Sequence, residues 1–358
     1  MCGICGVVHP DGRPVDPAVL QQMNAALQHR GPDSDGFYVE AGIGLGMRRL
    51  AIIDLSRGDQ PISNEDQSLW IVFNGEIYNF PELRAGLEAR GHRLQTASDT
   101  ECILHLYEER GDECVQALRG MFAFALWDGK RRRLLVARDR LGKKPLYYTL
   151  RDGSLLFSSE LPSLLCALPQ RPQLHLPAID LYLSLQYIPE PLTPYEGIFK
   201  LPAAHRLVWE DGELQIERYW QLTYEPKLEG SESDLARELA ARLQEAVQIR
   251  LMSEVPLGAH LSGGIDSSIV VALMAQAGRE PVKTFSAGFE ESSFSELPFA
   301  RQVAQRWGAD HHEFILNYGD IPATLASLAG WFGEPFADPS ALPLYHLSRL
   351  TRQHVPVA

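Results

Sequence analysis

The chain has 358 residues, of which 45% are hydrophobic and 22% charged, and its formal net charge is −13. This length exceeds one ordinary core and predicts two domains of about 100–200 residues each. The acidic balance argues against broad affinity for nucleic acid, which needs a basic surface. No apolar stretch approaches the roughly 18–20 residues that cross a bilayer, and five irregularly spaced cysteines favour a reducing compartment. We therefore expect a soluble, cytoplasmic protein without a membrane partner.

Cys2 directly follows Met1. Removal of Met1, which the small side chain at the second position favours, would leave a thiol and a free α-amine on the same residue. Because an α-amine titrates near neutrality, it can accept the thiol proton and act as the base. Cys2 and Cys5 also form a C-x-x-C pair, but the remaining cysteines supply no second pair for zinc, and no strand precedes the motif. We expect Cys5 to be a buried small hydrophobe.

The first part of the chain, residues 1–222, is predicted to be a sheet-rich α+β or layered αββα domain. Short apolar or alternating runs predict strands, and apolar residues at helical spacing predict a few intervening helices. The predicted strands are Gly42–Leu50, Leu69–Asn74, Met121–Trp127, Leu134–Arg138, Ser154–Ser158 and His205–Trp209, and the predicted helices are Pro17–His29, Pro81–Arg90 and Thr100–Arg110.

The second part, residues 223–358, begins with a linker-like stretch and a helix marked by Leu235, Leu239, Leu243 and Val247. Strand and helix patterns then alternate, which predicts a doubly wound parallel α/β sheet. The predicted elements are the strand Val255–Leu261, the helix Ser267–Ala277, the strand Val282–Phe289, the helix Glu296–Trp307 and the strand His312–Leu316.

The loop Ser262-Gly263-Gly264-Ile265-Asp266-Ser267-Ser268 follows the first of these strands. Two glycines, three serine hydroxyls and a helix N-terminus suit a phosphate or pyrophosphate. No lysine follows the glycines, so the loop is not a Walker motif for cleavage between the β- and γ-phosphates. A glycine turn with a Ser or Asp helix cap is the simpler explanation, but it accounts less well for the whole heptapeptide.

The order of several short motifs resembles that of glutamine-hydrolysing asparagine synthetases. In that family a class II glutamine amidotransferase domain, of the N-terminal nucleophile (Ntn) hydrolase type, is joined to an ATP-pyrophosphatase domain. The motifs are Cys2-Gly3-Ile4, His29-Arg30-Gly31-Pro32-Asp33, Arg49-Leu50, Asn74-Gly75-Glu76-Ile77-Tyr78-Asn79, Ser98-Asp99-Thr100-Glu101, Gly120-Met121-Phe122-Ala123-Phe124, Arg138-Asp139-Arg140-Leu141-Gly142 and the Ser262 heptapeptide.

The resemblance implies a glutaminase site in the first domain. Cys2 Sγ would attack the glutamine side-chain amide and release ammonia. Asn74 and the backbone N–H of Gly75 would hold the oxyanion. Arg49 would bind the α-carboxylate in a two-point contact, and Glu76 and Asp99 would hold the α-ammonium. A surface or structural ion pair is the alternative for each charged residue taken alone.

For the second domain, the resemblance implies ATP-dependent activation of a carboxylate as an acyl-adenylate, with release of pyrophosphate and with Mg²⁺ offsetting the charge. Ammonia would then amidate the carboxylate, which is aspartate in the asparagine synthetases. Glu334 and Asp338, in a proline-broken loop, are candidates for the acceptor or Mg²⁺ site, with solvated turn residues as the alternative. The implied ATP-binding residues are Leu261, Ser262, Gly263, Gly264, Asp266, Ser267 and Ala287.

Several alternatives remain open from the sequence. The acceptor could be another carboxylate, as in relatives that act on surface polysaccharides, or the chain could be a silent glutamine- or nucleotide-binding regulator. The resemblance also suggests that the chain stops before the end of the synthetase domain, so we expect glutaminase activity without ATP-dependent amide synthesis. A homodimer is compatible with the sequence, which specifies neither the oligomeric state nor the wall of an ammonia channel.

Overall fold

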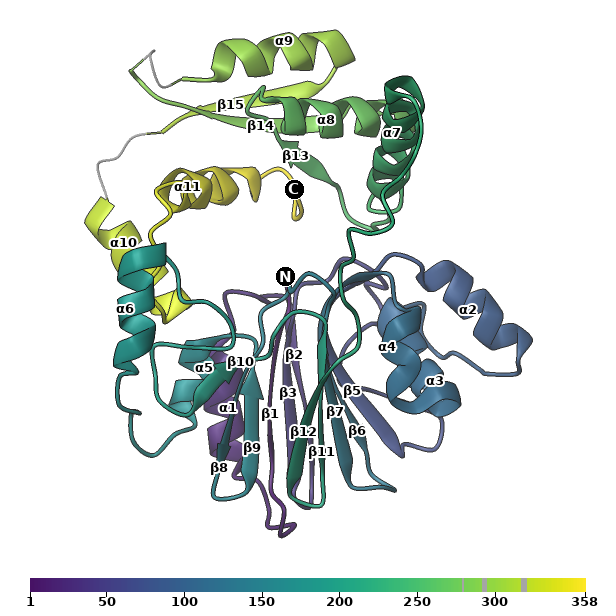
Figure 1. Ribbon diagram of the computed structural model, residues 1–358, viewed down its shortest axis with the longest axis vertical. Helices are drawn as coiled ribbons and strands as arrows, with labels where there is room; N and C mark the ends of the chain where they lie inside the picture. The colour runs from purple at the N-terminus through teal and green to yellow at the C-terminus, as the bar shows by residue number, and fades with distance from the viewer. Residues whose placement is uncertain (279, 292–294, 317–320) are drawn as a thin grey trace. The chain divides into compact units, whose positions relative to one another are not determined.

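The computed structural model describes residues 1–278, 280–291, 295–316 and 321–358 (Figure 1). Two compact units are present. The first contains Met1–Leu222 and Leu328–Ala337, and the second contains Thr223–Ser327 and Asp338–Ala358. Within the described residues no helix combines the length and apolar content that crossing a bilayer requires.

Two six-stranded antiparallel sheets form the first unit (Figure 1). β1 (Gly3–Val8) and β3 (Ile43–Arg49) of one sheet contact β5 (Leu69–Ile77) of the other. The first sheet has the order β10 (Ile198–Lys200), β8 (Tyr147–Arg151), β9 (Ser154–Ser158), β1 (Gly3–Val8), β3 (Ile43–Arg49), β2 (Ser34–Glu40). The second has the order β12 (Glu213–Arg218), β11 (His205–Glu210), β7 (Arg133–Arg138), β6 (Gly120–Asp128), β5 (Leu69–Ile77), β4 (Ile62–Ser63).

Helices cover the outer faces of these sheets, so the first unit is the predicted αββα sandwich. Helices α1 and α5 pack beside the first sheet, and α2 and α3 beside the second. Separate apolar clusters fill the space between the sheets and the space under each helical layer. The helices of this part of the chain are α1 (Pro17–Ala26), α2 (Phe80–Ala89), α3 (Asp99–Arg110), the 3₁₀ helix η1 (Gly111–Glu113), α4 (Cys114–Ala117), α5 (Leu161–Cys166) and α6 (Leu176–Leu185).

Local signals explain where the main helices begin. Asp16 caps α1 by accepting a hydrogen bond from the backbone N–H of Ala18, and Pro17 occupies the first helical position. Ser98 caps α3 in the same way through the N–H of Thr100. Helix α1 ends at Ala26, three residues before the predicted end at His29, because the chain turns at Leu27.

The second unit contains a parallel sheet of the order β13-β14-β15 among the described residues, as predicted. Helices α8 and α9 lie on one face and α11 on the other (Figure 1), and separate apolar clusters underlie the two faces. The predicted strand Val255–Leu261 is observed only as β13. The elements of this part of the chain are α7 (Glu232–Gln248), β13 (Gly258–His260), α8 (Ile265–Ala277), β14 (Lys283–Gly288), α9 (Leu297–Trp307), β15 (Asp310–Ile315), α10 (Ile321–Phe332) and α11 (Ala341–Thr351). The end of α10, from Leu328 on, belongs to the first unit.

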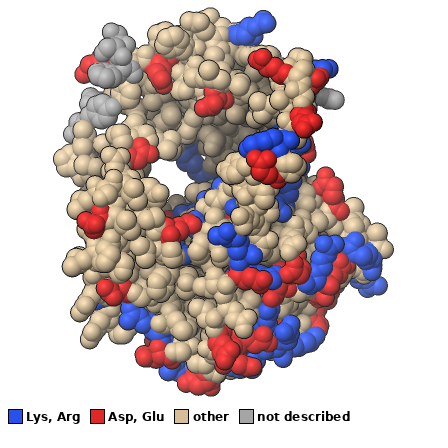
Figure 2. Space-filling model, viewed as in Figure 1, with Lys and Arg blue, Asp and Glu red and all other residues tan. Residues whose placement is uncertain are grey.

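Charged side chains of both signs are interspersed on the face of the first unit that Figure 2 shows. Surface ion pairs such as Arg206 with Glu113 and Glu217, at 2.7 and 2.8 Å, follow from this mixture. Such exposed pairs contribute little stability each. We therefore attribute the fold to the apolar clusters rather than to surface charge.

Candidate active site

Cys2 lies at the start of β1, beside the end of β3. The antiparallel pairing places Gly3 opposite Arg48, so Cys2 comes next to Arg49 and Leu50. Its Sγ lies 3.5 Å from the backbone N of Leu50 and 3.7 Å from its carbonyl O. Burial raises the pKa of the Cys2 thiol, while the Leu50 backbone and nearby positive charges act in the opposite direction. The thiol is thus held by backbone in a partly buried place.

Asn74 and Gly75 lie on β5, the strand that packs against β1 and β3. Asn74 is 1% exposed, and its Nδ2 has no hydrogen-bond partner in the described part of the chain. Buried donors without partners are rare and call for an explanation. A Cβ on Gly75 would lie 2.3 Å from the carbonyl O of Met121, so the close pairing of β5 with β6 requires glycine here.

Arg49 is buried, and the first unit itself uses several of its donors. Its Nη1 donates to Asp59 at 2.8 Å, and its Nη2 donates to the carbonyl oxygens of Ile53 and Asp54 at 3.0 and 2.7 Å. The side chain of Asp59 is 70% exposed. The α-carboxylate of a ligand would therefore have to displace Asp59, or bind beside it, to make the expected two-point contact with Arg49.

The first turn of α3 meets the end of β5, and this brings Asp99 close to Glu76 in space. Asp99 is 5% exposed and accepts a hydrogen bond from the backbone N–H of Ile77 at 2.8 Å. Burial raises the pKa of Asp99 to about 6. Glu76 immediately precedes Ile77 on β5 and is partly exposed. Both carboxylates thus lie at the end of the strand that carries Asn74.

The turn from His29 to Asp33 is anchored to Cys2 through Arg30. Arg30 Nε donates to the carbonyl O of Cys2 at 2.8 Å, and its Nη1 lies 2.7 Å from Glu160. His29 lies 2.9 Å from the other oxygen of Glu160 and stacks on Trp331 with ring centroids 5.2 Å apart. Arg30 therefore fixes the backbone of the cysteine.

Lys144 is a residue near Cys2 that the sequence analysis does not identify. It is 3% exposed, and its Nζ lies 3.0 Å from the Sδ of Met1. Burial, followed by the charge of Arg30, lowers the pKa of Lys144 to about 8, and the charges of Cys2 and Glu76 act in the opposite direction. The charge of Lys144 in turn acts against the burial that raises the pKa of Cys2. The signal available in the sequence was only its place after the Arg138–Gly142 motif.

The heptapeptide Ser262–Ser268 follows β13 in the second unit, and its last four residues, from Ile265 on, form the first turn of α8. Leu261 donates its backbone N–H to Phe285 O at 2.9 Å, which ties the loop to β14. Gly263 has φ +88°, and a Cβ there would lie 2.5 Å from the Cβ of Phe299. Gly264 caps α8 without a side-chain hydrogen bond, so the first N–H groups of the helix remain available to an anion.

The side chains around this loop suit a phosphate. Ser262 Oγ lies 3.0 Å from Ser267 Oγ and accepts the backbone N–H of Gly264 at 3.2 Å. Asp266 is exposed in the first turn of α8, where its carboxylate could serve a cation. Ala287 lies on the adjacent strand β14 and is half-buried. The hydroxyls are thus suited to the phosphates of a nucleotide, and the carboxylate is suited to the magnesium ion that accompanies it.

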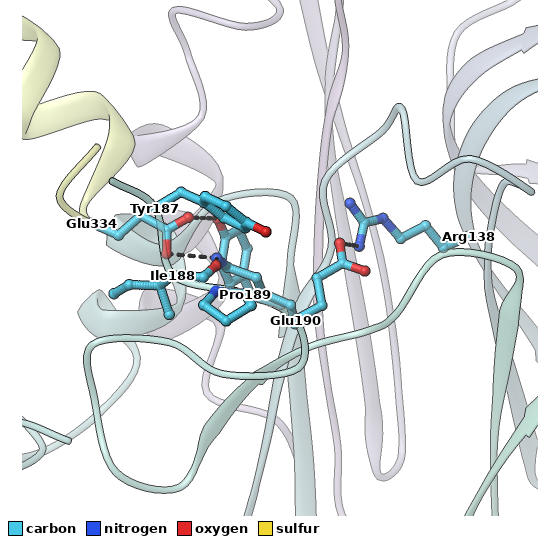
Figure 3. A pocket seen from close by; sticks show the side chains of 8 residues that line it. Arg138, Tyr187, Ile188, Pro189, Glu190 and Glu334 are labelled. Atoms are coloured by element: carbon cyan, nitrogen blue, oxygen red, sulfur yellow. Dashed lines mark hydrogen bonds and ion pairs between the residues drawn. The ribbon is translucent and has the colours of Figure 1, made fainter. Parts of the chain in front are cut away.

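Glu334 and Asp338 fall into different compact units. Glu334 lies in the first unit, 2.9 Å from Lys200 Nζ, and accepts a hydrogen bond from the Tyr147 hydroxyl at 3.1 Å. It borders an open pocket of about 460 Å³, with the Arg138–Glu190 ion pair on the other side (Figure 3). Asp338 is exposed and accepts from the backbone N–H and hydroxyl of Ser340, at 2.9 and 2.7 Å.

Two family models match the chain. A glutamine amidotransferase domain matches residues 1–220, and an asparagine synthase domain matches residues 238–358. The solved structure of a glutamine phosphoribosylpyrophosphate amidotransferase from B. subtilis covers 88% of this chain and 81% of its own at 15% identity, with a TM-score of 0.46.

Relatives align along the whole chain. Asparagine synthetase [glutamine-hydrolyzing] 1 of Bacillus subtilis is 39% identical, over 100% of this chain and 57% of its own length. A putative asparagine synthetase [glutamine-hydrolyzing] 2 of Methanocaldococcus jannaschii is 36% identical, over 100% of this chain and 73% of its own length. The chain thus spans little more than half of the Bacillus relative. With both domain models in this order and relatives of this identity, the chain belongs to the glutamine-hydrolysing asparagine synthetase family.

Proposed function

We propose that the first unit hydrolyses glutamine to glutamate and ammonia, with Cys2 as the nucleophile after removal of Met1. The observation that carries this proposal is the buried amide nitrogen of Asn74, which has no hydrogen-bond partner among the described residues. It lies on β5, which packs against β1, the strand that begins directly after Cys2. A buried donor without a partner costs about 1–3 kcal/mol. This cost is explained if Asn74 Nδ2 donates to an oxyanion that forms only during the reaction.

The chemistry uses groups of this chain throughout. The α-amine of Cys2 takes the thiol proton, and Sγ forms a bond to the side-chain carbonyl carbon of glutamine. Asn74 Nδ2 and the N–H of Gly75 stabilise the oxyanion. The C–N bond then breaks, and the proton held by the α-amine leaves with the amide nitrogen as ammonia. Water hydrolyses the resulting thioester, which releases glutamate and restores the thiol.

Three charged residues would select free glutamine over glutamine within a peptide. Arg49 would bind the α-carboxylate, with Asp59 yielding its place. Glu76 and Asp99 would hold the α-ammonium, and a raised pKa of about 6 still leaves Asp99 mostly ionised at neutral pH. A peptide glutamine lacks both of these terminal charges, so it would lose both contacts.

We further propose that the second unit binds ATP and takes part in activating a carboxylate as an acyl-adenylate, with aspartate as the acceptor. The loop Ser262–Ser268 would hold the pyrophosphate through its hydroxyls and the N-terminus of α8, and Leu261 and Ala287 would contact the nucleotide. Asp266 would hold Mg²⁺, which offsets phosphate charge when bound. Of the two candidates for the acceptor side, Asp338 belongs to the second unit, whereas Glu334 belongs to the first, where it pairs with Lys200. The five unpaired cysteines fit a cytoplasmic location.

The glutaminase proposal is tested by ammonia release from glutamine with purified protein whose Met1 removal is verified by intact mass. We expect Cys2→Ala to abolish release, because no other group provides the attacking thiolate. Cys166→Ala is the matched control, since Cys166 is exposed and belongs to the same compact unit, and it should retain full activity. Activity in Cys2→Ala, or none in the Met1-free wild type, would refute the proposal.

A further inference from the structure

Lys144 carries a buried ammonium that has no anionic partner in the described part of the chain. Its side chain is 3% exposed, and the contact of its Nζ is the thioether of Met1 at 3.0 Å. Among the residues that the structure describes, no carboxylate lies within ion-pair distance of this nitrogen. Burying an unpaired charge is costly, so it calls for an explanation. A thioether is a weak acceptor and does not balance the charge.

The surrounding loop holds Lys144 in place from both sides. Asp139 Oδ2 accepts the backbone N–H of Lys144 at 3.0 Å, and Asp139 Oδ1 accepts the N–H groups of Leu141 and Lys143 at 3.1 and 3.0 Å. Arg138 Nε donates to the carbonyl O of Lys144 at 2.7 Å. Asp139 itself is 2% exposed. The position of the buried lysine is therefore built into the loop.

The other charged groups around Cys2 are already engaged. Arg30 is paired with Glu160 and Arg49 with Asp59. The carboxylates that influence Lys144 are Glu76 and Asp139, and the latter is occupied by backbone N–H groups. Burial, followed by the charge of Arg30, lowers the pKa of Lys144 to about 8. At neutral pH it therefore still carries its positive charge.

Met1, whose thioether contacts Lys144, is the residue that must leave before Cys2 can act. We propose that Lys144 is a positioning residue whose ammonium stabilises the deprotonated form of Cys2 once Met1 is removed. The proposal rests on the proposed glutaminase function and assigns a role in it to a residue outside the expected site. An adjacent cation favours a thiolate, and it equally disfavours a protonated α-amine, so the base of the reaction also stays free.

The test measures the rate at which iodoacetamide alkylates Cys2 as a function of pH, in full-length protein carrying Cys166→Ser and lacking Met1 by intact mass. Peptide mass spectrometry restricts the reading to Cys2. In Lys144→Met the apparent thiol pKa should rise by about one unit, so alkylation at pH 7 should slow about tenfold. Lys144→Arg, which keeps the charge, should stay close to wild type.

Lys143→Met is the matched control because Lys143 is the exposed neighbour in the same loop, and it should change nothing. Thermal denaturation separates charge from packing: a charge role predicts an unchanged or raised melting temperature in Lys144→Met, because an unpaired buried charge is removed. If Lys144→Met does not fold, Lys144→Gln replaces it in the same assay.

An alkylation profile of Cys2 that is the same in the neutral variants as in wild type would overturn the inference. That result leaves the proposed function intact if wild-type protein releases ammonia and Cys2→Ala does not. Conversely, absence of ammonia release from wild type overturns the proposed function, whereas the alkylation profile still reports whether Lys144 acts on the thiol.

Discussion

The two candidate sites of this chain differ in how far the protein itself completes them. Around Cys2, the side chains of Arg30, Arg49 and Asp139 are fixed by ion pairs or by several backbone groups, and the site is largely buried. Around Ser262–Ser268, the hydroxyls of Ser262 and Ser267 bond to each other and to the backbone of Gly264. Ser262 and Asp266 are exposed, and the N-cap of α8 makes no side-chain hydrogen bond. The side chains around Cys2 are thus fixed by the first unit itself, whereas those around Ser262–Ser268 are mostly exposed and make few bonds to the rest of the second unit.

The largest effect is expected from removing the unpaired donor of the first site. Asn74→Ala should lower kcat for glutamine hydrolysis by about 10²–10³ with little change in KM, because the amide acts on the oxyanion alone. Since its Nδ2 has no partner in the described residues, the melting temperature should stay the same or rise. Steady-state kinetics and a thermal melt measure both. A kcat of Asn74→Ala within threefold of the wild-type value would show that Asn74 does not stabilise the oxyanion.

In the second site, we expect the largest effect from a change of backbone conformation at Gly263 rather than from the loss of a hydrogen-bond donor. Gly263→Ala places a Cβ 2.5 Å from that of Phe299 at φ +88°, so we expect a loss of about 1–3 kcal/mol in the stability of the second unit. Glutaminase activity should be unaffected. Gly264→Ala is the matched control, because Gly264 has an ordinary φ of −68°. Urea unfolding of both variants measures the difference, and equal stabilities would contradict the strain argument.

The pH dependence of glutamine binding tests Asp99. As the pH falls through about 6, Asp99 takes up a proton and can no longer hold the α-ammonium. KM for glutamine should therefore rise about tenfold between pH 7 and pH 5. Asp99→Asn should have a high KM that is nearly independent of pH in this range. A wild-type KM that is flat from pH 7 to pH 5 would argue against this residue as the ammonium partner.

The same raised pKa has an opposite consequence for stability. Between the ordinary aspartate value of 3.8 and about 6, the folded state binds the proton more tightly than the unfolded chain, so the contribution of Asp99 to stability falls as the pH rises through that window. In Asp99→Asn, which does not titrate, this fall in stability with rising pH should be absent. Comparison of the urea midpoints of wild type and variant at pH 4.5 and pH 7 provides the check, and an identical pH dependence would contradict it.

The smallest effect is expected from a single hydroxyl of the exposed loop. Ser262→Ala removes one donor to a phosphate and the acceptor for the Gly264 N–H, so ATP affinity should fall about fivefold, the equivalent of about 1 kcal/mol. Ser253→Ala, in the same unit but bonded to Val255, is the control. Calorimetric titration with magnesium–ATP measures the affinity, and an unchanged value would count against a phosphate site here.

Local patterns were sufficient to predict much of the fold. The predicted helix Thr100–Arg110 is observed as α3 (Asp99–Arg110), and the predicted strand Leu134–Arg138 as β7 (Arg133–Arg138). In both segments the apolar residues recur at the spacing of the observed element. For α3, Ser98 also marks the start of the helix as its N-cap. The strand expected over Val255–Leu261 is shorter because Pro256 cannot donate to a ladder. Leu257 forms an isolated bridge with Val357, and pairing with β14 begins at Gly258. The helices α6, α10 and α11 were not predicted.

Contacts between distant residues explain what the sequence could not predict about the site. Lys144 meets Met1 across 143 positions, and Arg30 meets Glu160 across 130. Neither contact leaves a periodic or spacing signal in the sequence. The pairing of Arg49 with Asp59 was also unforeseen, although the residues are close in sequence, because the intervening loop has no regular pattern. Motifs identify candidate residues, whereas burial and pairing require the tertiary structure.

The most direct test of the central claim is covalent labelling with the diazoketone analogue of glutamine, 6-diazo-5-oxonorleucine, followed by peptide mass spectrometry. If the cysteine thiol beside Leu50 is the nucleophile of a glutaminase, the label should appear on the N-terminal peptide that starts with Cys2, and excess glutamine should protect it. A label on another cysteine, or none on protein that begins with Cys2, would contradict the account.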